Sequence, residues 1–257
     1  MKNMATAWWV LFVIIPILTM GATAMAAVPE IPPSAEIELE TGAVWQTRND
    51  VAVPGDTGTR FALDDVTGSG PFAFARLNAA WNLAGRHGLR FVIAPLSFEG
   101  TGTLPYPVEF AGSAFEAGVP TEARYRFDSY RATYRYRVHD GERWRWWIGG
   151  TLKIRDAAIS LRQADISAEK SNVGVVPLFY ASGEGYVGAH WRFVLDFDGL
   201  AAPQGRAFDL ALKMVRDFES GWSVGAGYRT LEGGADNDEV YSFAWLHYAL
   251  VSASYRF

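Results

Sequence analysis

Residues 241–257 read YSFAWLHYALVSASYRF, and this stretch decides the class of fold. Counting back from Phe257, every second position belongs to one series: Tyr255, Ala253, Val251, Ala249, His247, Trp245, Phe243 and Tyr241. Successive side chains of a β-strand point to opposite faces of the sheet. The series therefore predicts a strand with one face that is mostly apolar and rich in aromatic rings.

The same period of two runs through residues 143–155, RWRWWIGGTLKIR. One parity holds Trp144, Trp146, Ile148, Leu152 and Ile154, and the basic residues Arg143, Arg145, Lys153 and Arg155 stand on the other. No stretch after the N-terminal region shows the i, i+3, i+4, i+7 spacing of an amphipathic helix. We therefore expect an all-β chain.

About ten alternating runs follow one another along the chain. They cover residues 36–48, 71–84, 88–99, 122–138, 143–156, 173–182, 186–198, 206–218, 221–231 and 241–257. Short turns rich in Gly or Asp (85–88, 139–142, 183–185 and 219–221) alternate with longer connections (49–70, 100–121, 157–172, 199–205 and 232–240). This alternation is typical of up-and-down hairpins in a transmembrane barrel. It predicts a closed antiparallel barrel of about ten strands, with eight or twelve as alternatives.

The end of the chain resembles the C-terminal assembly signal of bacterial outer-membrane β-barrel proteins, in which an alternating aromatic strand ends in Phe. Here the signal is Tyr255-Arg256-Phe257. The resemblance is to a class and not to one family. It implies a Gram-negative source, insertion by the barrel-assembly machinery, periplasmic termini and extracellular long loops. The alternative is a soluble secreted barrel or sandwich, which alternates in the same way but turns its apolar parity inward.

The N-terminal residues have the three parts of a secretory signal peptide. Lys2 supplies the positive charge, Trp8 to Met20 is almost wholly apolar, and Ala24-Met25-Ala26 is a small-residue cleavage site. The apolar core is shorter than the roughly 20 residues that a spanning helix needs. We expect residues 1–26 to be removed and residues 27–257 to form the barrel.

The composition supports the membrane interpretation. Aromatic residues make up 14% of the chain, and ten of them are Trp. Aromatic side chains gather where a barrel meets the two membrane surfaces. We assign this role to Trp81, Trp144, Trp146, Trp191, Tyr241, Phe243, Trp245, Tyr255 and Phe257. A net charge of −5 without a basic run argues against nucleic acid as a partner, and zero Cys excludes disulfides and thiolate chemistry.

If the apolar parity faces lipid, the charged parity faces the lumen. It holds Glu38, Glu40, Arg76, Arg90, Arg131, Arg135, Arg137, Arg143, Arg145, Lys153, Arg155, Arg192, Asp196, Asp209, Lys213 and Arg229. Ten strands leave a lumen that such side chains largely fill. Two hypotheses follow: a network of ion pairs that closes the lumen, or a narrow pore that favours anions. Because bases outnumber acids, we expect a net-positive interior.

Catalytic signals are weak. None of the four histidines shows the His-x-Ser pairing of lipid A deacylases, and the Asp-x-His pairing of the omptins, ten-stranded protease barrels, is also absent. Asp196 and Asp198 lie on the lumen parity and are the only candidates for activating a water molecule. Acidic groups in the loops, Asp64-Asp65 and Asp236 to Glu239, are better explained as solvated tips than as metal sites. No motif indicates a cofactor.

The sequence therefore favours a monomeric, non-enzymatic outer-membrane barrel with a structural, surface-interaction or small-solute role. Its expected partners are outer-membrane lipids, including lipopolysaccharide, and the assembly machinery. The alternative is a hydrolase that acts on lipid A, phospholipid or peptide at the extracellular mouth.

Overall fold

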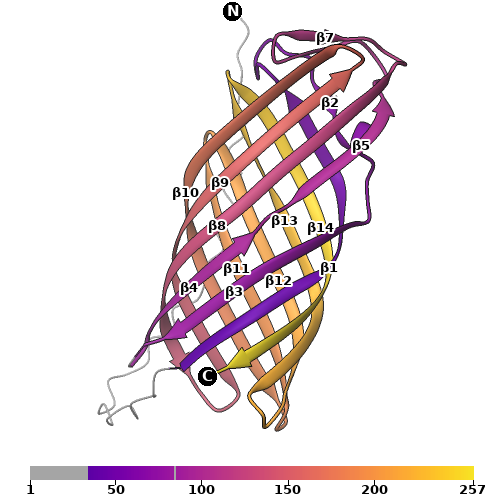
Figure 1. The fold of residues 1–257 in the computed structure, drawn as a ribbon. Coiled ribbons are helices and arrows are strands. Elements are labelled where there is room, and N and C mark those ends of the chain that lie inside the picture. The colour runs from indigo at the N-terminus through magenta and orange to yellow at the C-terminus, as the bar shows by residue number, and fades with distance from the viewer. Residues whose placement is uncertain (1–33, 84) are drawn as a thin grey trace, which may run out of the picture. The chain divides into compact units, whose positions relative to one another are not determined.

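The computed structural model describes residues 34–83 and 85–257, so the predicted signal peptide lies outside the described residues. Within them, ten antiparallel strands close into a barrel (Figure 1). They are β1 (Ser34–Ala52), β3 (Phe72–Asn82), β4 (His87–Ala94) continued by β5 (Ser97–Thr103), β8 (Pro120–Asp140), β9 (Trp144–Gln163), β10 (Ile166–Val187), β11 (Trp191–Ala202), β12 (Gly205–Asp217), β13 (Trp222–Asn237) and β14 (Val240–Arg256). The predicted all-β, up-and-down barrel is confirmed, with ten strands.

The first and last strands close the barrel. β1 pairs with β14 from Glu36–Arg256 to Ala52–Tyr241, and on its other side with β3. Every other barrel strand pairs with its neighbours in chain order. The closure removes the two free sheet edges that an open sheet of the same strands would expose.

Two long connections lie at one end of the barrel, the loop end. Residues 53–71 contain β2 (Phe61–Ala62) and α1 (Asp64–Thr67), and residues 104–119 contain the hairpin of β6 (Val108–Phe110) and β7 (Ser113–Phe115). The turns that join β3 to β4, β8 to β9, β10 to β11 and β12 to β13 lie at the other end, the turn end. No helix among the described residues has the length and hydropathy needed to cross a membrane.

Three connections predicted as longer loops are instead hairpins. β9–β10, β11–β12 and β13–β14 are joined by two residues each, at 164–165, 203–204 and 238–239. The prediction of loops at 157–172, 199–205 and 232–240 was therefore wrong. The strands continue past the apolar band, where polar side chains such as Ser160 and Arg162 replace the apolar parity. The alternating signal fades there although the hydrogen-bond ladder does not.

The turn predicted at residues 183–185 was also wrong, because these residues belong to β10 and the chain turns at 188–190. Gly183 lies opposite Trp146 in the ladder, and Gly185 lies opposite Trp144. A Cβ added at Gly183 would lie 2.4 Å from the Trp146 ring, and one at Gly185 would lie 2.5 Å from the Trp144 ring. Both glycines make room for indole rings rather than for a turn.

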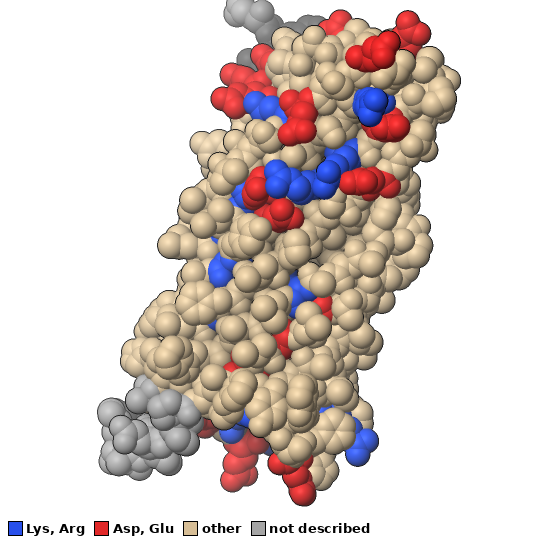
Figure 2. All heavy atoms as spheres, in the orientation of Figure 1, with Lys and Arg blue, Asp and Glu red and all other residues tan. Residues whose placement is uncertain are grey.

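The outer face carries an apolar band between charged borders. Along β9 the outward side chains run from Trp144 through Leu152, 61% exposed, to Ile154. The next outward residue, Asp156, pairs with Arg126 at 2.8 Å. Figure 2 shows this pattern as a mostly uncharged surface below a band of acidic and basic side chains towards the loop end. Such a band matches the hydrocarbon layer of a membrane.

Inside the loop end, the two long connections fold towards the lumen and build an apolar core. Leu63 and Phe110 are fully buried, and the ring of Phe110 meets that of Phe61 edge to face at 6.0 Å. The core also includes side chains from the barrel wall: Val44, Phe74, Phe98, Tyr125, Leu161, Leu246 and Tyr248. The lumen is therefore apolar at the loop end and charged in its middle.

Candidate functional site

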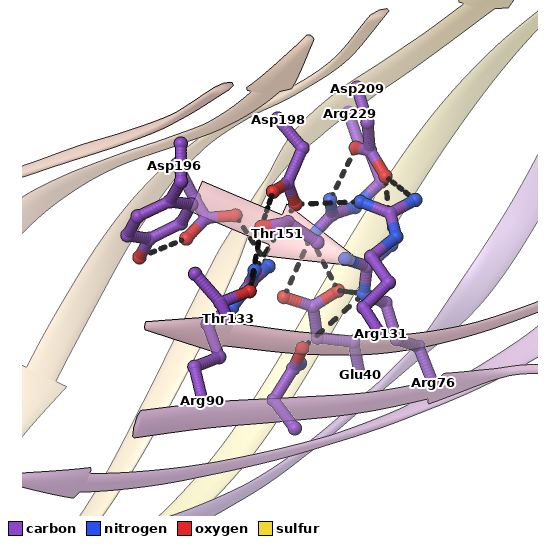
Figure 3. Close-up of polar contacts among 12 residues, drawn as sticks. Glu40, Arg76, Arg90, Arg131, Thr133, Thr151, Asp196, Asp198, Asp209 and Arg229 are labelled. Atoms are coloured by element: carbon purple, nitrogen blue, oxygen red, sulfur yellow. Dashed lines mark hydrogen bonds and ion pairs between the residues drawn. The ribbon is translucent and has the colours of Figure 1, made fainter. Parts of the chain in front are cut away.

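The middle of the lumen holds one continuous network of ion pairs, which we call the ion-pair layer (Figure 3). It joins five basic and five acidic side chains, so its formal charges balance. The members are Arg76, Arg90, Arg131, Lys213, Arg229, Glu38, Glu40, Asp196, Asp198 and Asp209. They come from seven strands, β1, β3, β4, β8, β11, β12 and β13.

Asp209 is the centre of the ion-pair layer. Its carboxylate accepts hydrogen bonds from Arg76 at 3.0 Å, from Arg131 at 2.6 Å and from Arg229 at 2.6 Å. Arg229 also donates to Glu40 at 2.8 Å. All of these side chains are buried. A buried charge is tolerated only when it is paired and hydrogen-bonded, and this arrangement meets both conditions.

Glu40 is the second carboxylate of the layer that several cations share. Besides Arg229, it accepts a hydrogen bond from the Lys213 ammonium at 2.9 Å, and Lys213 also donates to Glu38 at 2.6 Å. Glu38 and Glu40 lie on the inward face of β1 because they are two residues apart. They therefore bring the β12 lysine and the β13 arginine together across the lumen.

Asp198 and Asp209 lie opposite each other on β11 and β12, where two like charges would repel. Arg131 lies between them and donates to Asp198 at 2.7 Å as well as to Asp209. Asp198 also accepts from Arg90 at 3.1 Å and from the Thr151 hydroxyl at 2.6 Å. The cations on β4 and β8 thus offset the repulsion between the two Asp side chains that β11 and β12 place side by side.

Asp196, the other candidate for activating water, is held as well. It accepts hydrogen bonds from Arg90 at 2.8 Å and from the Tyr180 hydroxyl at 3.0 Å. Arg90 thus engages both Asp196 and Asp198, and both belong to the ion-pair layer.

Other charged residues of the predicted lumen set lie nearer the turn end. Arg192 is surrounded by Glu184 at 2.9 Å, Asp217 at 3.1 Å and Glu36 at 3.4 Å. Arg145 pairs with Asp140 at 3.0 Å. Arg137 pairs with the same carboxylate, and Arg135 donates to Asn82 at 2.8 Å and lies over the Trp147 ring.

Arg143 does not belong to the lumen. It lies in the turn before β9 and is exposed, because the strand begins at Trp144 and the parity rule no longer applies beyond it. Lys153 and Arg155 face inward from β9 but lie outside the ion-pair layer, on its loop-end side, where both line a cavity. The layer itself is therefore neutral, and these two residues carry the excess positive charge expected in this part of the lumen.

Sequence reasoning missed several polar partners. Thr151 shares the parity of Lys153, and that signal alone could have identified it. Glu184 was missed because the turn was placed at residues 183–185, and its inward direction follows once β10 is continued to Val187. Tyr180 lies within the predicted strand 173–182, but residues 173–180 are apolar on both parities, so the alternation did not show which way it points.

The predicted interface aromatics lie on the outer face. Most are exposed, among them Trp81, Trp144, Trp191, Trp245 and Phe257. Phe243 differs, since the guanidinium groups of Arg48 and Arg206 cover its ring at 5.4 and 5.0 Å from the centroid. Among residues 34–83 and 85–257, no three His, Asp or Glu side chains converge as a metal site.

Comparison with known proteins supports the fold. No family model and no curated protein matches the chain. The outer-membrane protease OmpT of Escherichia coli superposes with a TM-score of 0.56 at 8% identity, over 90% of this chain and 99% of OmpT. At that identity the similarity shows the fold alone.

Two further barrels superpose less well. Ail of Yersinia pestis has a TM-score of 0.41 at 12% identity, over 88% of this chain and all of Ail. The toluene transporter TodX of Pseudomonas putida has a TM-score of 0.33 at 11% identity, over 88% of this chain and 90% of TodX.

Proposed function

We propose that the chain is an integral protein of the bacterial outer membrane whose lumen is closed and does not conduct ions. The observation that carries the proposal is the ion-pair layer, in which ten charged side chains, eight of them buried, cross the lumen. An open channel needs room and free hydrogen-bonding groups for water. Here the central carboxylate, Asp209, already binds three guanidinium groups.

In this proposal the turn end faces the periplasm and the loop end faces outward. β1 begins and β14 ends at the turn end (Figure 1). Outer-membrane barrels keep short turns on the periplasmic side and longer loops outside. Tyr255 and Phe257 at the turn end then serve as the assembly signal that the barrel-assembly machinery recognises.

Membrane lipids are the expected partners of the outer face. The charged border of the apolar band includes Arg48 paired with Asp50 at 2.7 Å, and Arg206 paired with Glu232 at 2.7 Å. Side chains of this kind at the outer border lie at the level of lipid headgroups, including those of lipopolysaccharide. The role that fits a closed barrel with a projecting loop end is structural or binding, carried out by a monomer.

We favour a non-enzymatic role over hydrolysis because Asp196 and Asp198 are both held by Arg90. Replacing each of them with Asn tests the alternative. Turnover of lipid A, phospholipid or peptide by the parent protein, lost in the variants, would establish the hydrolase instead.

The test of the closed lumen is conductance in a planar bilayer. We expect the folded protein, identified by its heat-modifiable migration in gels, to give no steady channel current. The Asp209→Asn variant, which loosens the layer, serves as the comparison. A stable current in the parent protein would overturn the closed-lumen proposal, and recovery of the protein in the soluble periplasmic fraction would overturn the membrane location.

A further inference from the structure

A cavity of about 550 Å³ lies on the loop-end side of the ion-pair layer. That is the size of a small-molecule site, for which about 300–1,000 Å³ is typical. Its walls are largely apolar and come from opposite sides of the barrel. They include Phe127, Ile159, Val176, Leu178, Leu200 and Leu231.

The cavity lies at a gap in the barrel wall. β10 and β11 pair from Val187–Trp191 only as far as Phe179–Gly199. Beyond that pair, β10 continues to Ile166 and bonds only with β9, while β11 continues to Ala202 and bonds only with β12. Residues from both edges of the gap line the cavity. The free edge of β10 contains Pro177, which has no N–H to leave unpaired.

The gap opens at the border of the apolar band. Val175 on the free edge of β10 is 67% exposed on the outer face. In the ladder it lies opposite Ile154, the last large outward apolar residue of β9. A molecule held near the outer surface of the membrane could therefore reach the cavity sideways, without crossing the two folded loops.

The charges of the cavity wall do not balance. Three of its cations are paired: Arg131 with Asp198 and Asp209, Arg206 with Glu232, and Lys170 with Glu239. The charged residues that remain in the wall are two cations, Lys153 and Arg155. Across the described part of the chain, no carboxylate oxygen lies within 4.0 Å of either group.

Lys153 is the more unusual of the two because it is only 3% exposed. Its ammonium lies 4.7 Å from the centroid of the Phe127 ring and has no hydrogen-bond acceptor among the described residues. Arg155, two residues along the same face of β9, donates to the side-chain oxygen of Asn172 at 2.6 Å. A buried ammonium without a partner is unfavourable, and an anion placed against it would relieve that cost.

We propose that this cavity binds a single-chain amphiphilic carboxylate, of the fatty-acid class, that enters through the gap between β10 and β11. Its carboxylate lies against Lys153 and Arg155, and its chain packs along Leu178, Leu200 and Leu231. The chemistry follows from the site, because an apolar wall selects a hydrocarbon chain and unpaired cations select an anionic head. This inference goes beyond the proposed function, since a closed barrel with an empty cavity would be equally non-conducting.

The test uses the full barrel in nanodiscs of zwitterionic lipid, with a dansyl-labelled undecanoate as the bound probe. Dodecanoate, dodecanol and dodecyltrimethylammonium then compete for the probe, and empty nanodiscs give the background. We expect dodecanoate to compete at least about tenfold better than dodecanol, the difference that one charge-assisted contact provides. Equal competition by all three competitors would overturn the proposal of an anion-selective site. It would leave the proposal of a closed, non-conducting lumen unaffected.

Three variants locate the site. Lys153→Met should weaken dodecanoate about tenfold and leave dodecanol within about twofold, because only the charge is removed. Val176→Trp should fill the cavity and weaken both, whereas Val173→Trp, on the outer face of the same strand, should change neither. Each variant must first show the heat-modifiable migration of the folded barrel. Unchanged dodecanoate binding in both folded Lys153→Met and Val176→Trp would place the ligand elsewhere and refute the proposal.

Discussion

The two halves of the lumen bury side chains by different means. In the middle, Asp209 and its neighbours satisfy one another through charge, with five cations against five carboxylates. At the loop end, residues such as Phe110 and Leu246 are buried by apolar contact. Removing one member of a buried ion pair leaves its partner as an unpaired buried charge. Truncating an apolar side chain instead lowers stability in proportion to the volume removed. The two halves should therefore respond differently to mutation.

The largest effect is expected from Asp209→Asn. The substitution keeps the shape of the side chain but leaves three guanidinium groups around a neutral amide. Losing one partner of a buried ion pair costs about 3–5 kcal/mol. Denaturant titration of the barrel in liposomes, followed by Trp fluorescence, measures the change in the free energy of unfolding.

The matched control for Asp209→Asn is Glu232→Gln, which removes the acid of a partly exposed ion pair with Arg206. Exposed pairs contribute about 1 kcal/mol or less. If both variants lost the same amount, burial of the ion-pair layer would contribute nothing to its strength.

Phe110→Ala tests the apolar half and should have the second largest effect. Phe110 is fully buried against Phe61 in the folded-in loops. Truncating a buried Phe costs about 3–5 kcal/mol, and we expect the lower end here because connecting loops can relax into the space left.

The loss from Phe110→Ala should appear mainly in the loops. We expect faster proteolysis within residues 104–119, with the heat-modifiable migration of the barrel preserved. If the variant failed to form the barrel at all, folding of the barrel would require the apolar core that the loops build.

The smallest effect is expected from Lys153→Met in the absence of ligand. Because Lys153 is buried without a carboxylate partner, removing its charge should leave stability unchanged or raise it by up to about 1 kcal/mol. The same denaturant titration measures this. A decrease of more than about 1 kcal/mol in the free energy of unfolding would mean that Lys153 belongs to the ion-pair layer. The boundary between the charged and apolar halves would then lie nearer the loop end.

Much of the architecture could be predicted because alternate residues of a membrane-barrel strand face the lipid and the lumen, so the sequence alternates between apolar and polar side chains. The parity of the charged residues was enough to predict that they face the lumen, as it did for Arg131, Lys153, Asp209 and Lys213. The partners could not be predicted, since the contact between Lys213 and Glu40 joins residues 173 positions apart. Contacts of this kind depend on barrel closure and strand tilt, which local alternation does not contain.

The loop end was less predictable for a physical reason. Outside the apolar band both faces of a strand meet water or polar groups, so residues 157–172 lost the alternation while keeping the ladder. The connections at 53–71 and 104–119 fold back onto the barrel interior, and neither has an alternating pattern that predicts which of its apolar residues will be buried. Phe61, Leu63 and Phe110 became core residues through this return alone.

The pairing of β1 with β14 also constrains the order in which the barrel can form. Glu36 bonds to Arg256 across 220 positions of the chain, so the seam joins the first strand described to the last. Such distant contacts form slowly, because a long loop must close before they give any stabilisation. Until β14 arrives, β1 exposes an unpaired edge that could join any other strand. The seam can therefore close only after β14 has been synthesised.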